Sequence, residues 1–168
     1  MSLALRFVKN YIIWDQSLSD YDWLNSDEIP ADPLGDLQTK KNTLSIYIIG
    51  DDNSKLERCI SAYAANRNDI EEISFVLFDE NVIKNIGIKY KQNNNGLLLD
   101  EFINSLHYDL YELSSQKLIE LTNNIYGKCF CDIKDRVQVT QLIYTSIENK
   151  WINESQLNRG IKKQLAIN

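Results

Sequence analysis

Three aspartates could do metal chemistry if the fold brings them together. Asp51 and Asp52 directly follow one apolar run, and Asp79 follows a second one. Carboxylate oxygens and water are the ligands that Mg²⁺ takes in proteins. If both runs are parallel strands, the three carboxylates meet at the carboxyl edge of the sheet, where α/β proteins bind ligands. One hypothesis is therefore a Mg²⁺-dependent phosphoryl-transfer or phosphodiester-hydrolysing enzyme.

The same aspartates also fit an ordinary structural role. Asp and Asn are preferred residues at helix N-caps, and Asp52-Asn53-Ser54 and Asp79 precede predicted helices. A capping carboxylate already has a hydrogen-bond partner in the first turn of its helix. Our principal interpretation is therefore capping with no cofactor, and Mg²⁺ belongs only to the enzyme alternative.

Two apolar strands and a helix would position these side chains. Residues 44–49 (LSIYII) and 73–78 (ISFVLF) are apolar at nearly every position, which is typical of strands covered on both faces. Such a strand, helix and strand predict a βαβ unit with the two strands parallel. The helix between them, residues 53–66, has one apolar face made of Leu56, Cys59, Ile60, Tyr63 and Ala64.

We therefore predict an α/β protein with a small parallel or mixed sheet built on a βαβ unit and an all-helical C-terminal subdomain. The loop-like stretch QNNNG marks the boundary, with the sheet in residues 1–96 and a helical part in residues 97–168 packed on it as one compact domain. Pro30, Pro33 and Gly35 predict a turn before the first buried strand. The helical prediction rests on the apolar stripes Phe102, Leu106, Leu110; Leu118, Leu121, Ile125; and Val139, Leu142, Ile143, Ile147.

The segment of residues 15–36 combines acidic side chains with large aromatic ones. Its seven acids, with no base among them, are Asp15, Asp20, Asp22, Asp27, Glu28, Asp32 and Asp36. Aromatic side chains within a negative electrostatic field are suited to binding a basic protein. The field speeds association, and the rings supply contact area that the partner buries. A solvated acidic loop whose tryptophans pack on the sheet is the alternative. The candidate partner-binding residues are Trp14, Asp20, Tyr21, Asp22, Trp23, Asp27 and Glu28.

The charge distribution disfavours several other partners. Residues 1–113 contain 10 basic and 19 acidic side chains, whereas residues 114–168 contain 8 and 5. The acidic part would repel phosphates, and the basic excess of the remainder is too small for a nucleic-acid footprint. The scattered glycines form no phosphate-binding loop. No apolar run approaches the roughly 20 residues that cross a bilayer, so we expect no membrane partner.

Cysteine and histidine usage gives no catalytic centre. An odd number of cysteines, Cys59, Cys129 and Cys131, indicates reduced thiols and a cytoplasmic location. The single histidine, His107, precedes Asp109 by two residues on a predicted helix. Residues two apart on a helix face different directions, so we expect no catalytic dyad.

These observations favour a non-catalytic intracellular protein-binding or regulatory module. Toxin-neutralising proteins of the immunity or antitoxin kind share this size and acidity, but the comparison is by class and not by matching residues. We expect the acidic aromatic surface to bind a protein partner. We expect no catalytic residue. A homo-oligomer is also compatible with the sequence.

Overall fold

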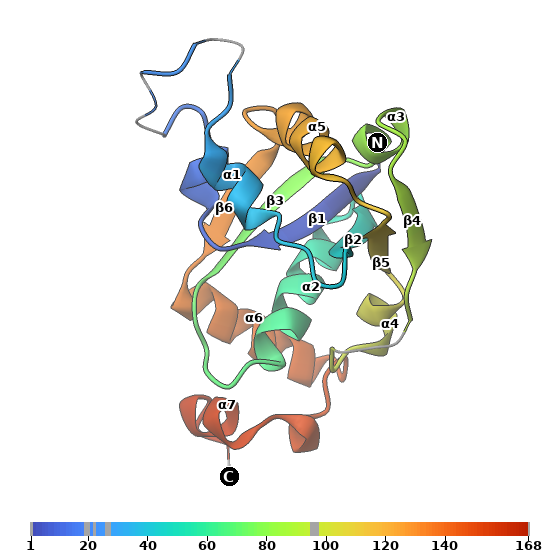
Figure 1. The fold of residues 1–168 in the computed structure, drawn as a ribbon. Coiled ribbons are helices and arrows are strands. Elements are labelled where there is room, and N and C mark those ends of the chain that lie inside the picture. The colour runs from blue at the N-terminus through green and yellow to red at the C-terminus, as the bar shows by residue number, and fades with distance from the viewer. Residues whose placement is uncertain (1, 19–20, 22, 26–27, 95–97, 168) are drawn as a thin grey trace.

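A six-stranded antiparallel sheet forms the centre of the protein. The computed structural model describes residues 2–18, 21, 23–25, 28–94 and 98–167. The strand order is β4-β5-β2-β1-β3-β6 (Figure 1). The strands are β1 (Leu3–Val8), β2 (Leu44–Gly50), β3 (Ile73–Asp79), β4 (Lys89–Gln92), β5 (His107–Tyr111) and β6 (Phe130–Lys134). Strands and helices together make an α/β protein in the broad sense, as predicted.

The position of β1 corrects the predicted βαβ unit. β1 pairs antiparallel with β2 on one side and with β3 on the other. The two apolar strands therefore run in the same direction but do not pair, because β1 separates them. The prediction of a parallel or mixed sheet was wrong, since each pairing between the described strands is antiparallel.

Helices cover both faces of the sheet. The α-helices are α1 (Ala31–Asp36), α2 (Asn53–Ala65), α3 (Asn81–Asn85), α4 (Glu101–Asn104), α5 (Ser115–Ile125), α6 (Arg136–Glu148) and α7 (Arg159–Gln164). The described residues also form two 3-10 turns, η1 (Tyr11–Trp14) and η2 (Glu154–Gln156). α2 and α6 pack together on one face, and α1, α3 and α5 lie on the other (Figure 1). None of the helices in the described part of the chain has the length and apolar character that crossing a membrane requires.

Alternation along the strands produces two separate cores. Successive side chains of a strand point to opposite faces, so adjacent residues of β1 enter different cores. Ala4 packs with η1, α3 and α5, whereas Leu5 packs with α2 and α6. β3 does the same, since Val76 and Phe75 are both fully buried but on different faces. This burial on both faces explains why β3 is apolar throughout.

The C-terminal part is not all helical, contrary to the prediction. β5 and β6 both belong to it, and they join the sheet beside β2 and β3 respectively. The predicted stripe from Phe102 to Leu110 breaks because α4 ends at Asn104, and Leu110 is instead buried as an inward residue of β5. α5 and α6 do form where predicted, and Ser114 caps α5 by accepting the backbone N–H of Lys117.

The predicted turn at Pro30 to Gly35 is a short helix. Pro30 is the N-cap of α1, and Pro33 lies in its first turn. The backbone N–H groups of a first turn have no intrahelical acceptor, so a proline there removes no hydrogen bond. α1 ends at Asp36, which this helix places in the interior.

Candidate functional site

The acidic segment is closed at its base by a buried polar contact. Trp14 is 0% exposed, and its Nε1 donates to Asp36 Oδ2 at 3.1 Å. The same carboxylate accepts the backbone N–H of Lys9, at 3.0 Å and 3.1 Å from its two oxygens. This Trp14–Asp36 clamp holds η1 and α1 together. Trp14 therefore has no surface to offer a partner, and its role is to anchor the segment.

Trp23 is the most exposed aromatic side chain of the segment. It is 70% exposed, and its ring meets Tyr21 edge-on, with centroids 6.2 Å apart and planes at 89°. The Tyr21 hydroxyl donates to Asp32 Oδ2 at 2.7 Å, and this hydrogen bond raises the pKa of Tyr21 to about 12. Glu28 is exposed and accepts from the backbone and side-chain N–H groups of Asn25. The other predicted contacts, Asp20, Asp22 and Asp27, lie outside the described residues.

The three aspartates of the metal hypothesis are not brought together. Gly50 and Asp79 both pair with Leu3, from opposite sides of β1. Two strand spacings, roughly 10 Å, therefore separate the ends of β2 and β3. Within the described residues, no three or more His, Cys, Asp or Glu side chains form a group that could hold a metal ion.

The capping interpretation describes Asp52 and Asp79 better. Asp52 is the N-cap of α2 and accepts the backbone N–H of Ser54 at 2.9 Å. Hydrogen bonds from Ser54 lower the pKa of Asp52. The N-cap residue of α3 is Glu80 and not Asp79 as predicted, but Asp79 Oδ1 accepts the backbone N–H of Asn81 at 2.9 Å, just where α3 begins. Asp51 is exposed in the turn between β2 and α2.

The cysteines are free thiols that burial keeps protonated. Cys59 is fully buried in α2, as its place on the apolar face predicted, and burial raises its pKa. Burial likewise raises the pKa of Cys129 to about 12 and that of Cys131 in the same direction. A nucleophilic cysteine needs a lowered pKa. None of these three thiols has the environment of a catalytic nucleophile.

His107 and Asp109 share one face of β5, because this stretch is a strand and not the predicted helix. His107 Nε2 lies 3.7 Å from Asp109 Oδ1, beyond hydrogen-bond distance. Its Nδ1 lies 3.0 Å from the carbonyl oxygen of Asn93 and therefore donates to it. Ser45 Oγ donates to Asp109 at 3.3 Å. A catalytic triad runs from serine to histidine to aspartate, so this order does not activate Ser45.

β1 and β2 separate at one end of the sheet and leave an opening, which we call the strand gap. Their pairing ends at Leu5 and Tyr47, although β1 continues beside β3 and β2 continues beside β5. The Arg6 side chain enters the gap, and its Nη1 donates to the carbonyl oxygen of Ser45 at 2.9 Å. Arg6 Nε is buried and has no hydrogen-bond partner within the described part of the chain. Burial lowers the pKa of Arg6, and the Asp36 carboxylate acts in the opposite direction.

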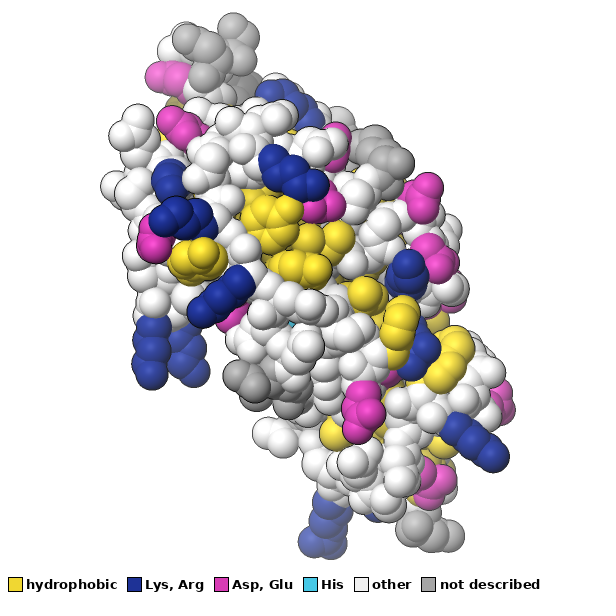
Figure 2. Space-filling view, turned by 90° about the vertical axis from the view of Figure 1, so that its right-hand side faces the viewer, with side chains coloured by type: hydrophobic (Ala, Val, Ile, Leu, Met, Phe, Trp, Pro, Cys, Tyr) yellow, Lys and Arg dark blue, Asp and Glu magenta, His cyan; other side chains and the backbone are white. Residues whose placement is uncertain are grey.

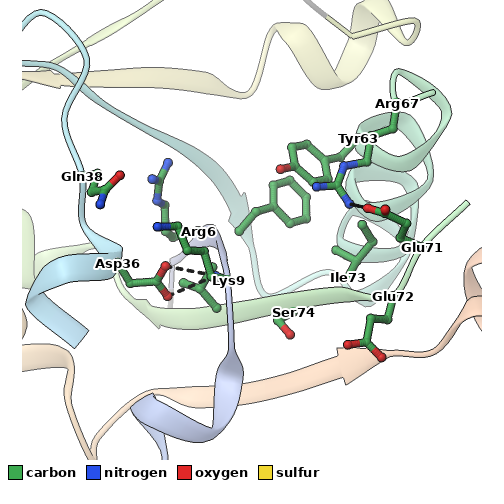
Figure 3. Close-up of a pocket in the computed structure, with 12 residues that line it drawn as sticks. Arg6, Lys9, Asp36, Gln38, Tyr63, Arg67, Glu71, Glu72, Ile73 and Ser74 are labelled. Carbon is green, nitrogen blue, oxygen red and sulfur yellow. Dashed lines mark hydrogen bonds and ion pairs between the residues drawn. The ribbon is translucent and has the colours of Figure 1, made fainter. Parts of the chain in front are cut away.

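Three adjoining cavities surround Arg6. One of about 740 Å³ is bordered by Lys9, Asp36 and Arg67, and Figure 3 shows Arg6 in it between Gln38 and Tyr63. A second, of about 340 Å³, has an aromatic wall in which the rings of Phe7 and Tyr63 stack 3.9 Å apart. The third, of about 430 Å³, is lined by Arg6, Gln38, Lys40, Lys41, Thr43 and Ser45.

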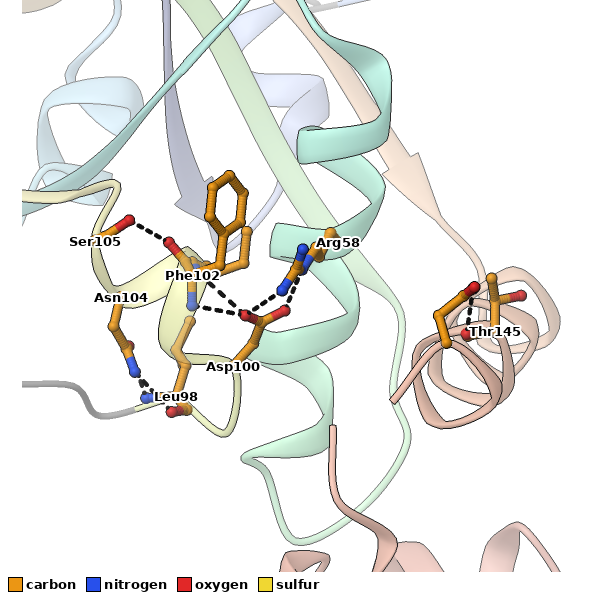
Figure 4. A network of polar contacts seen from close by, with 9 residues as sticks. Arg58, Leu98, Asp100, Phe102, Asn104, Ser105 and Thr145 are labelled. Atoms are coloured by element: carbon orange, nitrogen blue, oxygen red, sulfur yellow. Dashed lines mark hydrogen bonds and ion pairs between the residues drawn. The ribbon is translucent and has the colours of Figure 1, made fainter. Parts of the chain in front are cut away.

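A polar network on the other side of α2 is structural. Asp100 is 1% exposed, forms an ion pair with Arg58, and accepts the backbone N–H of Phe102 at 2.9 Å (Figure 4). The Arg58 guanidinium lies over the rings of Phe102 and Trp151, at 4.6 and 4.7 Å from their centroids. Because these groups satisfy one another, they fix α4 on α2. Figure 2 shows that hydrophobic side chains on this side of the protein reach the surface in patches separated by charged ones.

Comparison with protein-family models, with curated proteins and with solved structures gave no match. Of the residues around the strand gap, the sequence pattern did not identify Arg6, Lys40 or Lys41. A charged residue inside an apolar strand was the available signal for Arg6. The two lysines follow the acidic segment after three uncharged residues, and the change from negative to positive charge was the signal there.

Proposed function

We propose that this chain is a non-catalytic protein-binding module that recognises a basic partner through residues 15–36. The observation that carries the proposal is Trp23, a tryptophan that is 70% exposed in a segment without a basic residue. Tryptophan is enriched among the residues that dominate binding energy at interfaces.

The segment is held in a way that lowers the cost of binding. The Trp14–Asp36 clamp fixes both of its ends to the body of the protein. Tyr21 restrains Trp23 through their edge-on contact, and Asp32 restrains Tyr21 in turn. Side chains that are ordered before binding lose less conformational entropy on association.

The charge of the segment supplies the selectivity for a basic partner. Glu28 and Asp32 are exposed beside the aromatic residues, and no base of the segment compensates them. A single-sign field steers oppositely charged proteins and repels acidic ones, mainly by changing the association rate. We further propose a cytoplasmic location, on the ground that the three cysteines are free thiols.

The test is quantitative affinity capture with tagged full-length protein, followed by identification of the captured proteins. Trp23→Ala should weaken the binding of a genuine partner by about 2 kcal/mol or more, which is a factor of roughly 30 in affinity. Val137→Ala is the matched control, because Val137 is 77% exposed but lies on α6. Glu28→Lys should slow association and reduce its dependence on salt. Equal capture by wild type and Trp23→Ala, or a partner that is not basic, would refute the proposal.

A further inference from the structure

Arg6 is placed where a structural arginine would be poorly satisfied. It belongs to β1, a central strand, with its guanidinium in the strand gap. Its Nε, buried and without a hydrogen-bond partner among the described residues, leaves one donor of the guanidinium unused. An unpaired buried donor destabilises a fold, and buried charges are normally paired. The guanidinium of Arg6 therefore lacks a hydrogen-bond acceptor in the gap, and an anion is the group best suited to supply one.

Asp36 does not supply this acceptor. It is the carboxylate that acts on Arg6 electrostatically, but its oxygens already accept from Lys9 and from Trp14. Across the described residues, Arg6 forms no ion pair within 4.0 Å. Glu71, which borders the cavity of about 740 Å³, is paired with Arg67. The positive charge of Arg6 is therefore left for a group outside the chain.

The lysines at the mouth of the gap are positioned by a tight hairpin. Lys40 and Thr43 exchange both backbone hydrogen bonds, at 3.0 and 3.1 Å. The two residues between them, Lys41 and Asn42, have φ of 52° and 61°, as two-residue hairpin turns require. The cavity beside this hairpin is lined by three basic residues, and none of its six lining residues is acidic. A basic cavity in a chain of net charge −6 is an exception that local structure creates.

We propose that the strand gap binds the phosphate group of a small phosphorylated molecule, with Arg6 at its base and Lys40 and Lys41 at its mouth. A phosphate has enough oxygens to accept from a guanidinium and two ammonium groups at once. The adjoining aromatic cavity, with Tyr63 on its wall, has room for an organic group attached to the phosphate. Cavities of about 430 and 340 Å³ are of the size that small ligands occupy. This site shares Asp36 with the acidic segment but requires no protein partner.

The experiment follows the side chains directly, in ¹⁵N–¹H NMR spectra of the full chain at low ionic strength. The probes are inorganic phosphate and adenosine monophosphate, each at about 10 mM, which would saturate a site with a Kd of about 1 mM. We expect shifts of the Arg6 Nε–H signal and of the backbone amides from Lys40 to Ser45. Tighter binding of the nucleotide would indicate that the aromatic cavity holds the organic group. Equal affinity would limit the site to the phosphate itself.

Variants separate this site from general charge effects. Lys40→Ala and Lys41→Ala should each weaken binding about two- to fivefold, because both side chains are exposed. Lys55→Ala is the matched control at the opposite end of β2 and should leave the affinity unchanged. Arg6→Gln should weaken binding about tenfold or more. The lysine variants keep the test decisive if Arg6→Gln fails to fold.

Two results would overturn the proposal. One is the absence of any shift at Arg6 and at residues 40–45 with both probes at full concentration. The other is binding that Lys40→Ala, Lys41→Ala and Lys55→Ala weaken equally, since that pattern belongs to net charge and not to a site.

Discussion

Replacing Asp36 by asparagine should destabilise the protein far more than an ordinary surface change. Asp36 is 6% exposed and accepts from two donors, the backbone N–H of Lys9 and Nε1 of Trp14. An asparagine has one acceptor oxygen, so in either orientation its –NH₂ group lies against one of these donors. Oδ2 accepts from both donors, so the better orientation keeps the oxygen there and places the –NH₂ group at Oδ1, against the N–H of Lys9. Losing the charge weakens each of the two hydrogen bonds by about 1 kcal/mol, and the contact between the –NH₂ group and this N–H adds about 1 kcal/mol.

Together these effects give a loss of about 3 kcal/mol, which corresponds to a melting temperature about 6–12 °C lower for a chain of this size. Thermal unfolding followed by circular dichroism measures this change directly. The matched control is Asp51→Asn, the same substitution at an exposed aspartate, which should stay within about 0.5 kcal/mol of wild type. If both variants unfold at the same temperature, the Trp14–Asp36 clamp does not hold the segment.

Two further measurements test packing and titration. Gly160→Ala should lower the free energy of unfolding by about 1–3 kcal/mol, because a Cβ there would overlap the carbonyl oxygen of Asn68. In Gly35→Ala the added Cβ meets nothing within 4 Å, so this variant should be more stable than wild type by about 0.4–1 kcal/mol. Urea unfolding measures both changes. The Tyr21 phenol should titrate near pH 12 in an NMR pH series, because its hydroxyl donates a hydrogen bond to Asp32 that is lost on ionisation. Its stabilising contribution is complete below the ordinary pKa of 10.0 and is lost as the pH rises toward 12; an unchanged titration in Asp32→Ala would contradict this.

Local patterns in the sequence predicted the elements whose burial is regular. β2 and β3 are covered on both faces, so their apolar runs were sufficient to identify them. α2 was identified from its single apolar face, and Asp52 from the preference of helix N-caps for aspartate. In each case the deciding interactions lie within one element or one turn.

Pairing between distant strands could not be predicted in the same way. Nothing within β2 or β3 indicates that β1, from the start of the chain, inserts between them. β5 was mistaken for a helix because Leu106 and Leu110 are four residues apart, a spacing that also occurs where a short helix is followed by a strand. Short apolar stretches leave helix and strand ambiguous until tertiary contacts decide.

The candidate sites show the same division. The acidic segment could be found from composition, since charge is a property of the residues themselves. The clamp could not, because Trp14 and Asp36 are 22 positions apart and meet only when η1 and α1 pack. Arg6 lies in a gap that exists because β1 and β2 diverge, so its environment depends on the pairing that the sequence did not reveal.

Asp36 connects the two surfaces proposed to bind ligands. Its oxygens accept hydrogen bonds from Trp14 and Lys9 at the base of the acidic segment. Its negative charge favours the charged form of Arg6 in the strand gap. Without it, Arg6 would carry a partly buried charge with no compensating carboxylate. Among the described residues no hydrogen bond or ion pair joins Asp36 to Arg6, so the compensation is electrostatic only, and the Nε donor of the guanidinium remains unpaired. One buried acid thus keeps the segment folded and leaves the arginine free to bind an anion.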